Sequence, residues 1–217
     1  MNVTPSKENI LKRVRNALSQ PVPLPYPQAE GKQAVFGTEE GDLGILFAEA
    51  FSNLSGRFVF CANHEELAGN LKALATMGKW SAVYCRELPL VHALEPFALP
   101  FLNASDDIRD ANAGLTGCEA LVARTGSVVL SAGQPSGRTV GIFPPVHIVV
   151  AYADQLVFDI RDAFILLRKK YGENLPSMIS FQSGPSRTSD IEKKSVIGVH
   201  GPREVYVFLV DTEQQDI

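Results

Sequence analysis

The chain has 217 residues, of which 45% are hydrophobic and 20% are charged, and its formal net charge is -4. These values are ordinary for a globular protein with a substantial core, and the negative charge argues against non-specific binding of nucleic acid, which needs a basic surface. The longest mostly apolar run, residues 140–153, is interrupted by prolines and a histidine, so it falls short of the ~20 apolar residues of a membrane span.

The first 40 residues are predicted to form a helix followed by a proline-rich linker. Thr4 is a favourable N-cap, Pro5 suits the first helical position, and apolar residues then recur on one helical face. Four prolines alternate with other residues over 21–27, so the helix ends there and the chain becomes extended. We therefore expect residues 1–40 to be an arm, whose helix packs on its own domain or on another copy of the chain in a homo-oligomer.

Residues 41–217 are predicted to form one α/β domain. Amphipathic helical patterns over 43–54 and 67–77 alternate with short apolar runs over 58–61 and 82–85. Helices that alternate with fully apolar strands predict a layered, mostly parallel sheet.

The second half of the chain adds a hairpin, further strands and one helix. Apolar runs over 119–123 and 127–131 flank a turn at Gly126, which is typical of a hairpin. A helix over 160–171 has Asp159 as its expected N-cap. The remaining predicted strands lie at 146–150, 155–158, 178–181 and 205–210, and the last is expected to close the sheet.

The sequence SGPSRT at residues 183–188 is predicted to bind an anion. Gly184 permits close approach of a ligand, Ser186 and Thr188 supply hydroxyl donors, and Arg187 suits two-pronged binding of a phosphate or carboxylate. Thr188 is placed to cap a helix that begins near Asp190, where the helix dipole would favour negative charge. The alternative is a capped turn in which Arg187 pairs with a neighbouring acid, with Asp190 orienting it.

A second glycine-rich segment, GVHGPR at residues 198–203, contains the main candidate for proton transfer. Histidine as a residue type suits proton transfer and ligand hydrogen bonding, which makes His200 the candidate, and Gly201 beside it lets a ligand come close. We predict His200 and Asp190 as catalytic residues; a histidine that only fastens its loop to the backbone is the alternative. Arg138, in a glycine-containing loop, is predicted as a second anion-binding residue, whereas His147 lies in an apolar strand and is predicted to be a satisfied core residue.

The sequence pattern SRTSDIE…GVHGPRE resembles the closing signature of the lactate utilization protein C family, also called YkgG-like or LUD-domain proteins. Upstream, ARTGSV at 123–128 resembles the glycine hairpin of that family, and FPPVHI at 143–148 resembles its next strand. The resemblance extends from about Gly114 to Val210. It implies a fold similar to sugar-phosphate isomerases, CoA transferases and formyltetrahydrofolate cyclo-ligases, and a role as one of three proteins that act together to oxidise L-lactate to pyruvate.

The same resemblance implies that Thr125, Gly126 and Ser127 lie beside the ligand, as the equivalent turn does in the sugar-phosphate and CoA enzymes. Those enzymes commonly carry a glutamate just before this turn, where the present chain has Arg124. This departure counts against a covalent mechanism that uses a carboxylate at that position.

The cysteines bear on cofactors and compartment. Cys61, Cys85 and Cys118 include no Cys-x-x-Cys pair, so we expect no iron–sulfur or zinc site made by this chain alone. The odd number of cysteines, with spacings that suggest no disulfide framework, favours the cytoplasm. The N-terminus, which has no apolar leader, favours it as well.

Three functions follow as hypotheses. The first is an accessory subunit of a cytoplasmic lactate-utilization system that binds a small anionic ligand, with the iron–sulfur clusters in partner subunits. The second is a stand-alone enzyme, like the isomerases, CoA transferases or cyclo-ligases, that acts on a phosphorylated or carboxylated small molecule. The third, a regulatory ligand sensor, has the least support because no DNA-reading element is evident.

Overall fold

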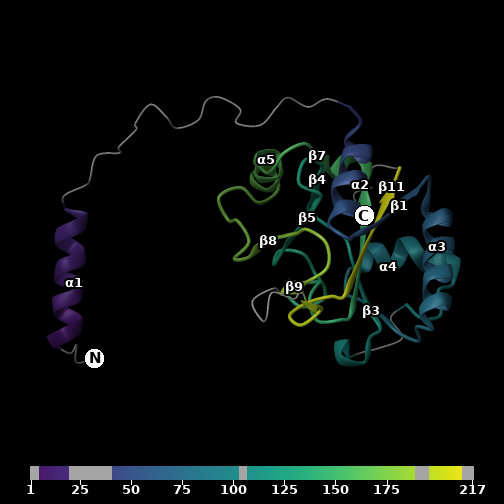
Figure 1. The fold of residues 1–217 in the computed structure, drawn as a ribbon, viewed down its shortest axis with the longest axis horizontal. Coiled ribbons are helices and arrows are strands. Elements are labelled where there is room, and N and C mark those ends of the chain that lie inside the picture. Colours follow the sequence, from purple (N-terminus) through teal and green to yellow (C-terminus); the bar gives the residue numbers. More distant parts are fainter. Residues whose placement is uncertain (1–4, 20–40, 103–106, 189–195, 212–217) are drawn as a thin grey trace. The chain divides into compact units, whose positions relative to one another are not determined.

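The structure is a computed structural model, and it describes residues 5–19, 41–102, 107–188 and 196–211 (Figure 1). The chain divides into two compact units, residues 1–40 and residues 41–217. The described part of the first unit contains helix α1 (Pro5–Leu18), which begins at the predicted proline. The proline-rich segment lies outside the described residues.

The second unit is built around a five-stranded sheet in which every neighbouring pair is parallel. Its strands, in spatial order, are β1 (Arg57–Cys61), β11 (Glu204–Val210), β6 (Val146–Tyr152), β3 (Ala113–Thr116) and β2 (Val83–Cys85). The predicted layered, mostly parallel α/β sheet is thus confirmed. The final strand, β11, lies between β1 and β6 (Figure 1) rather than closing the edge of the sheet.

A second, four-stranded sheet was not foreseen as separate. It has the order β7 (Leu156–Val157), β4 (Ala120–Val122), β5 (Ser127–Ser131) and β8 (Ile179–Gln182). The predicted hairpin is confirmed as the antiparallel pair β4–β5. Two short strands, β9 (Arg187–Thr188) and β10 (Val196–Ile197), form an antiparallel pair of their own.

Helices cover both sheets in layers. Helices α3 (His64–Gly78) and α4 (Leu88–Leu94) pack on one face of the five-stranded sheet, while α2 (Leu43–Asn53) and the four-stranded sheet pack on the other (Figure 1). Helix α5 (Ile160–Tyr171) covers the far side of the four-stranded sheet. Asp159 caps α5 as predicted. Short 3₁₀ turns lie at Glu95–Phe97, Ile108–Asp110 and Ala153–Gln155.

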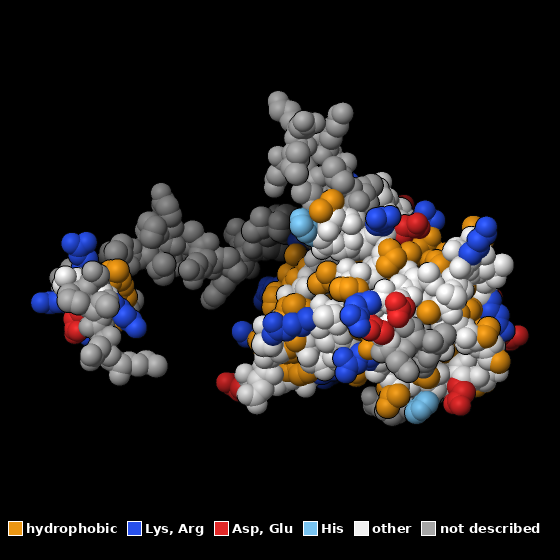
Figure 2. Space-filling view, turned by 90° about the horizontal axis from the view of Figure 1, so that it is seen from below, with side chains coloured by type: hydrophobic (Ala, Val, Ile, Leu, Met, Phe, Trp, Pro, Cys, Tyr) orange, Lys and Arg blue, Asp and Glu red, His pale blue; other side chains and the backbone are white. Residues whose placement is uncertain are grey.

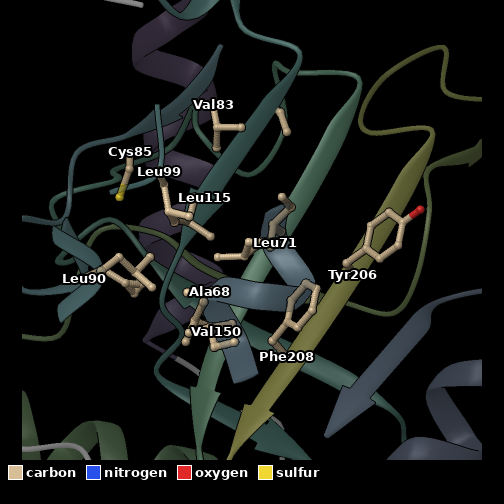
Figure 3. Close-up of a cluster of buried hydrophobic side chains, with 14 of the residues drawn as sticks. Ala68, Leu71, Val83, Cys85, Leu90, Leu99, Leu115, Val150, Tyr206 and Phe208 are labelled. Carbon is tan, nitrogen blue, oxygen red and sulfur yellow. The ribbon is translucent and has the colours of Figure 1, made fainter. Parts of the chain in front are cut away.

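The core explains why the parallel strands are apolar throughout. Along β6, Ile148 and Val150 point to the layer of α3 and α4, whereas Val149 and Ala151 point to α2 and the second sheet. Figure 3 shows the first of these layers, with Val150 and Phe208 facing the α3 side chains. Burial on both faces leaves the carboxyl ends of the strands as the natural place for polar groups.

The surface carries mixed charge. On the face shown in Figure 2, Lys and Arg side chains lie among acidic and hydrophobic ones rather than in one continuous stripe. In the part of the chain that the structure describes, every helix is too short or too polar to cross a bilayer.

Candidate functional site

The two predicted glycine-rich loops meet. The backbone nitrogen of Ser186 donates to the carbonyl of Pro202 over 3.0 Å, and the nitrogen of Gly198 donates to the carbonyl of Ser186 over 2.9 Å. A Cβ atom built at Gly201 would lie 3.0 Å from the Cβ of Ser186. We call segments 125–127, 183–187 and 198–203 the glycine-loop cluster.

The turn before β5 joins this cluster through hydroxyl groups. The Ser127 Oγ lies 2.7 Å from the Ser183 Oγ and 2.8 Å from the Thr125 Oγ1, both within hydrogen-bond distance. Gly126 has a φ of +56°, and a Cβ atom there would lie 2.6 Å from the backbone nitrogen of Phe51. The turn therefore seats directly on the backbone of α2, which only glycine permits.

Among the described residues, Arg187 binds the end of α2. Its Nη2 donates to the carbonyl of Leu54 over 2.9 Å and to the Ser55 Oγ over 2.5 Å. The last carbonyls of a helix have no partner within the helix, so the guanidinium satisfies one of them. Gly184 approaches the same carbonyl, because a Cβ atom built on it would lie 2.5 Å from the Leu54 oxygen.

The predicted catalytic histidine lies at the surface of this cluster. His200 is exposed, and together with Gly201 and Arg203 it lines a shallow hollow of about 370 Å³ whose remaining walls include Ile142 and Phe143.

Two further predicted residues and one segment fall elsewhere. Arg138 does not line the hollow. Its Nη2 donates to the Ser177 Oγ over 2.7 Å. Thr188 belongs to β9, where it pairs with Val196 of β10. Asp190 and the helix expected around it lie outside the described residues.

A second candidate site, which we call the carboxylate pocket, lies at the carboxyl ends of β2, β3 and β6. It has a volume of about 260 Å³. Ligands of open α/β sheets bind at this edge of the strands. The residues that line it are Glu87, Pro89, Leu90, Gly117, Cys118, Gly133, Gln134, Pro135, Val150, Tyr152, Gln155, Lys170 and Tyr171.

Glu87 is held at the pocket wall by two donors. Its Oε2 accepts from the backbone nitrogen of Gly117 over 3.0 Å, and its Oε1 accepts from the hydroxyl of Ser136. Burial raises the pKa of Glu87, the charge of Glu119 raises it further, and the two hydrogen bonds and Lys170 oppose the shift. A carboxyl group with a raised pKa in a cleft is typical of a proton-handling residue.

Glu119 is the most buried charge of this region. It accepts hydrogen bonds from Ser131 (2.6 Å), Tyr171 (2.7 Å) and Lys170 (2.8 Å). Its side chain is 2% exposed, whereas that of Lys170 is 59% exposed. Burial lowers the pKa of Lys170, but the hydrogen bond and charge of Glu119 outweigh it, so the pKa is raised. Glu119 therefore holds a hydroxyl, a phenol and an ammonium group around one buried carboxylate.

Cys118 and Gln155 complete the floor of the pocket. The Gln155 Nε2 donates to the Cys118 carbonyl over 2.7 Å, and its Oε1 accepts from the backbone nitrogen of Tyr152 over 2.9 Å. Burial raises the pKa of the Cys118 thiol well above its usual value. The thiol is consequently a neutral wall group rather than a nucleophile.

His147 contacts residues that adjoin both candidate sites. As predicted, it is a fully buried and satisfied core residue: its Nε2 lies 2.9 Å from the Thr116 Oγ1 and its Nδ1 lies 2.7 Å from the Gln182 Oε1. Thr116 precedes the pocket residue Gly117, and Gln182 precedes the loop residue Ser183. Burial lowers the pKa of His147 to about 4, against the opposing effect of its bond to Gln182.

The model of the LUD domain matches residues 102–210. This chain belongs to the LUD domain family. Proteins named "Lactate utilization protein C" are similar to it: one from Geobacillus sp. (strain WCH70) is 35% identical over 109 residues, which are 49% of this chain and 45% of that protein. One from Halalkalibacterium halodurans is 38% identical over 104 residues (46% and 45%), and one from Bacillus subtilis is 35% identical over 104 residues (46% and 43%). These matches thus span a little under half the length of the curated relatives.

A solved structure supports the fold. A DUF162 family protein from Deinococcus radiodurans has a TM-score of 0.54 and 21% sequence identity, covering 77% of this chain and 96% of that one. The LUD match contains the whole glycine-loop cluster and Glu119, whereas Glu87 lies before it. Among the described residues of this LUD protein, no group of three or more His, Cys, Asp or Glu side chains is arranged to hold a metal ion.

Proposed function

We propose that this chain is an accessory subunit of a cytoplasmic system that oxidises L-lactate to pyruvate. The observation that supports this role is its similarity, at 35–38% identity, to proteins named for lactate utilization. Lactate oxidation needs an electron acceptor, and we propose that iron–sulfur clusters in partner subunits supply it. In this proposal the LUD protein contributes a bound ligand and a docking surface rather than the redox centre.

We further propose the glycine-loop cluster as the site for a small anionic ligand. Its hydroxyl groups at Ser127, Ser183 and Ser186 are donors for anionic oxygens, and Arg203 and His200 line one hollow beside Gly201. Arg187 stands at the adjoining end of α2, where a carboxylate or phosphate would compete with the Leu54 carbonyl for its guanidinium. Gly184, Thr125 and Gly126 shape the cluster, Thr188 adjoins it, and His200 with Asp190 would transfer protons.

Genetic complementation tests the role in lactate use. A strain that lacks this gene is expected to fail on L-lactate as the sole carbon source but to grow on glucose, and the full-length chain should restore growth. His200→Ala should not restore it, whereas Arg168→Ala, a change of an exposed arginine on α5, should. Normal growth of the deletion strain on L-lactate would refute the proposal.

Ligand binding is tested separately with the purified protein. Thermal shift in the presence of L-lactate, pyruvate, CoA, nucleotides and sugar phosphates should identify at least one anion that raises the melting temperature. Arg138→Ala tests the second predicted arginine: it should leave that shift unchanged if only the clustered loops bind the anion. If none of these anions shifts the wild-type melting temperature, the anion-binding part of the proposal fails while the genetic part stands.

A further inference from the structure

We infer that the carboxylate pocket is a second ligand site, selective for a small uncharged molecule that carries hydroxyl groups, with Glu87 as its hydrogen-bond acceptor. This inference is independent of the lactate-utilization role. It rests on the position of the pocket, the way its polar walls are held, and the balance of charge inside it.

The pocket draws its walls from segments far apart in sequence. Glu87 follows β2, Gly117 and Cys118 follow β3, Tyr152 ends β6, and Lys170 comes from α5. Three parallel strands therefore direct their carboxyl ends to one hollow, which is where open α/β sheets bind ligands.

Two glycines make room for its polar side chains. A Cβ atom at Gly117 would lie 2.9 Å from the Oε2 of Glu87, the same oxygen that accepts the Gly117 backbone hydrogen. A Cβ atom at Gly133 would lie 2.6 Å from the hydroxyl oxygen of Tyr171. Both side chains are thus packed against bare backbone, which fixes their direction before any ligand arrives.

The charge balance argues against an anion in this pocket. Lys170 is the one basic residue of the lining within the described chain, and its ammonium group already binds Glu119 and lies 5.3 Å from the ring centroid of Tyr171. An anionic ligand would face the carboxyl group of Glu87 and the nearby carboxylate of Glu119 without a cation of its own. A hydroxyl-bearing, uncharged ligand instead donates hydrogen bonds to these acceptors.

Glu87 has capacity left to accept such a bond. Each of its oxygens holds one donor, from Gly117 or Ser136, and a carboxylate oxygen has two lone pairs. The groups whose charge acts on Glu87 are Glu119, which raises its pKa, and Lys170, which lowers it. The adjacent titratable side chains are Cys118 and Tyr152, whose pKa values are both raised by burial and, to a lesser degree, by Glu87.

Size and apolar surface limit the ligand further. The volume of about 260 Å³ lies just below the range of about 300–1,000 Å³ that is usual for ligand clefts. Pro89, Leu90, Pro135 and Val150 line the same space, so carbon atoms have apolar contacts. A compact compound such as a short polyol or hydroxyketone fits these requirements.

Amide chemical shifts of the labelled full-length protein provide the test. Glycerol, erythritol and dihydroxyacetone serve as uncharged probes, and L-lactate, pyruvate and inorganic phosphate as anionic ones. We expect at least one uncharged probe to shift the amide signals of Gly117 and Gly133 in a saturable way, and the anions to leave both signals unchanged. Affinity for the uncharged probe should rise as pH increases through the titration of Glu87, because the ionised carboxylate is the stronger acceptor of a hydroxyl hydrogen bond.

Glu87→Gln, which keeps the size of the side chain, should weaken that binding at least tenfold and abolish its pH dependence. Glu95→Gln, which alters an exposed glutamate, is the matched control and should bind as wild type does. If Glu87→Gln fails to fold, the pH dependence of the wild-type affinity decides alone. Saturable shifts of Gly117 and Gly133 by an anion, no response to any uncharged probe, or wild-type affinity in a folded Glu87→Gln protein would each overturn the inference, whatever the outcome of the growth test.

Discussion

The glycine-loop cluster and the carboxylate pocket are assembled in opposite ways. The cluster depends on backbone: Gly126 and Gly184 adopt positive φ and press on α2, and short hydroxyl side chains join the loops. The pocket depends on side chains brought together over long separations, such as Ser136 with Glu87 and Tyr171 with Glu119. Glycine-rich loops can be recognised in a sequence, whereas a pocket of scattered acids appears only once the strands are aligned.

Gly126→Ala should have the largest effect on the cluster. The new Cβ atom would lie 2.6 Å from one backbone atom of α2 and 2.7 Å from another, at a φ of +56°, so we expect a loss of at least about 3 kcal/mol in the free energy of unfolding. Chemical denaturation measures it. Gly137→Ala is the control, because its φ is +62° but nothing lies within 4 Å of the new atom; it should cost only about 1 kcal/mol. Equal losses would show that α2 does not press on the turn.

The pH dependence of stability should identify the residue that joins the two regions. The pKa of His147 falls from 6.5 to about 4 on folding, so the unfolded chain binds the proton more readily between these values. Stability conferred by the neutral ring is complete above pH 6.5 and is lost progressively as pH falls towards 4, by roughly 3 kcal/mol.

His147→Gln should remove this part of the pH dependence, as measured by denaturation at a series of pH values. His92→Gln, at an exposed histidine, should retain the wild-type slope. An unchanged slope in His147→Gln would mean that other groups govern stability in this range.

The contrast between local and long-range contacts explains which elements of the fold could be predicted from the sequence. The apolar runs of β1, β6 and β11 and the capped helix α5 are local patterns, so they were predicted close to their observed bounds. The split into two sheets depends on the pairing of β8 with β5, two strands that are far apart in the chain. A local sequence pattern does not indicate which distant strands pair.

The site residues show the same contrast between local motifs, which could be predicted, and long-range contacts, which could not. Ser186 and Gly201 belong to two glycine-rich loops that are recognisable in the sequence, and the structure brings these loops into contact. Glu87 and Glu119 belong to no recognisable motif, so neither was predicted as a site residue. One signal was available for Glu87: it lies two residues beyond a run that was predicted as a parallel strand, where a carboxylate is directed to the ligand edge of the sheet. Glu119 offered no such signal, because it begins the run predicted as a strand over 119–123 and the strand before it, β3, was not predicted.

Removing Glu119 should destabilise the pocket by a smaller amount. Glu119→Ala leaves the hydroxyls of Ser131 and Tyr171 without their acceptor, while Lys170, which is 59% exposed, turns to water. We expect a loss of about 2 kcal/mol by chemical denaturation. Glu173→Ala, at an exposed acid just after α5, should stay within about 0.5 kcal/mol of wild type.

A double-mutant cycle with Lys170→Met separates the ion pair from the hydroxyl bonds. A coupling of about 1 kcal/mol or less is expected, because solvent screens the exposed ammonium. A coupling that accounts for the whole effect of Glu119→Ala would mean that the ion pair, and not the network of hydroxyl groups, holds the pocket together.

Arg187→Ala should change stability least of all, since the side chain is exposed and binds the end of α2 through two hydrogen bonds. We expect a loss of about 1 kcal/mol or less, with the melting temperature within a few degrees of wild type, together with loss of the thermal shift caused by the anion. Because the guanidinium binds a helix carbonyl when no ligand is present, its value to stability and its availability to an anion are opposed. A loss above about 2 kcal/mol would assign Arg187 to the structure of the loop, and the anion site would then depend on Arg203 and His200 alone.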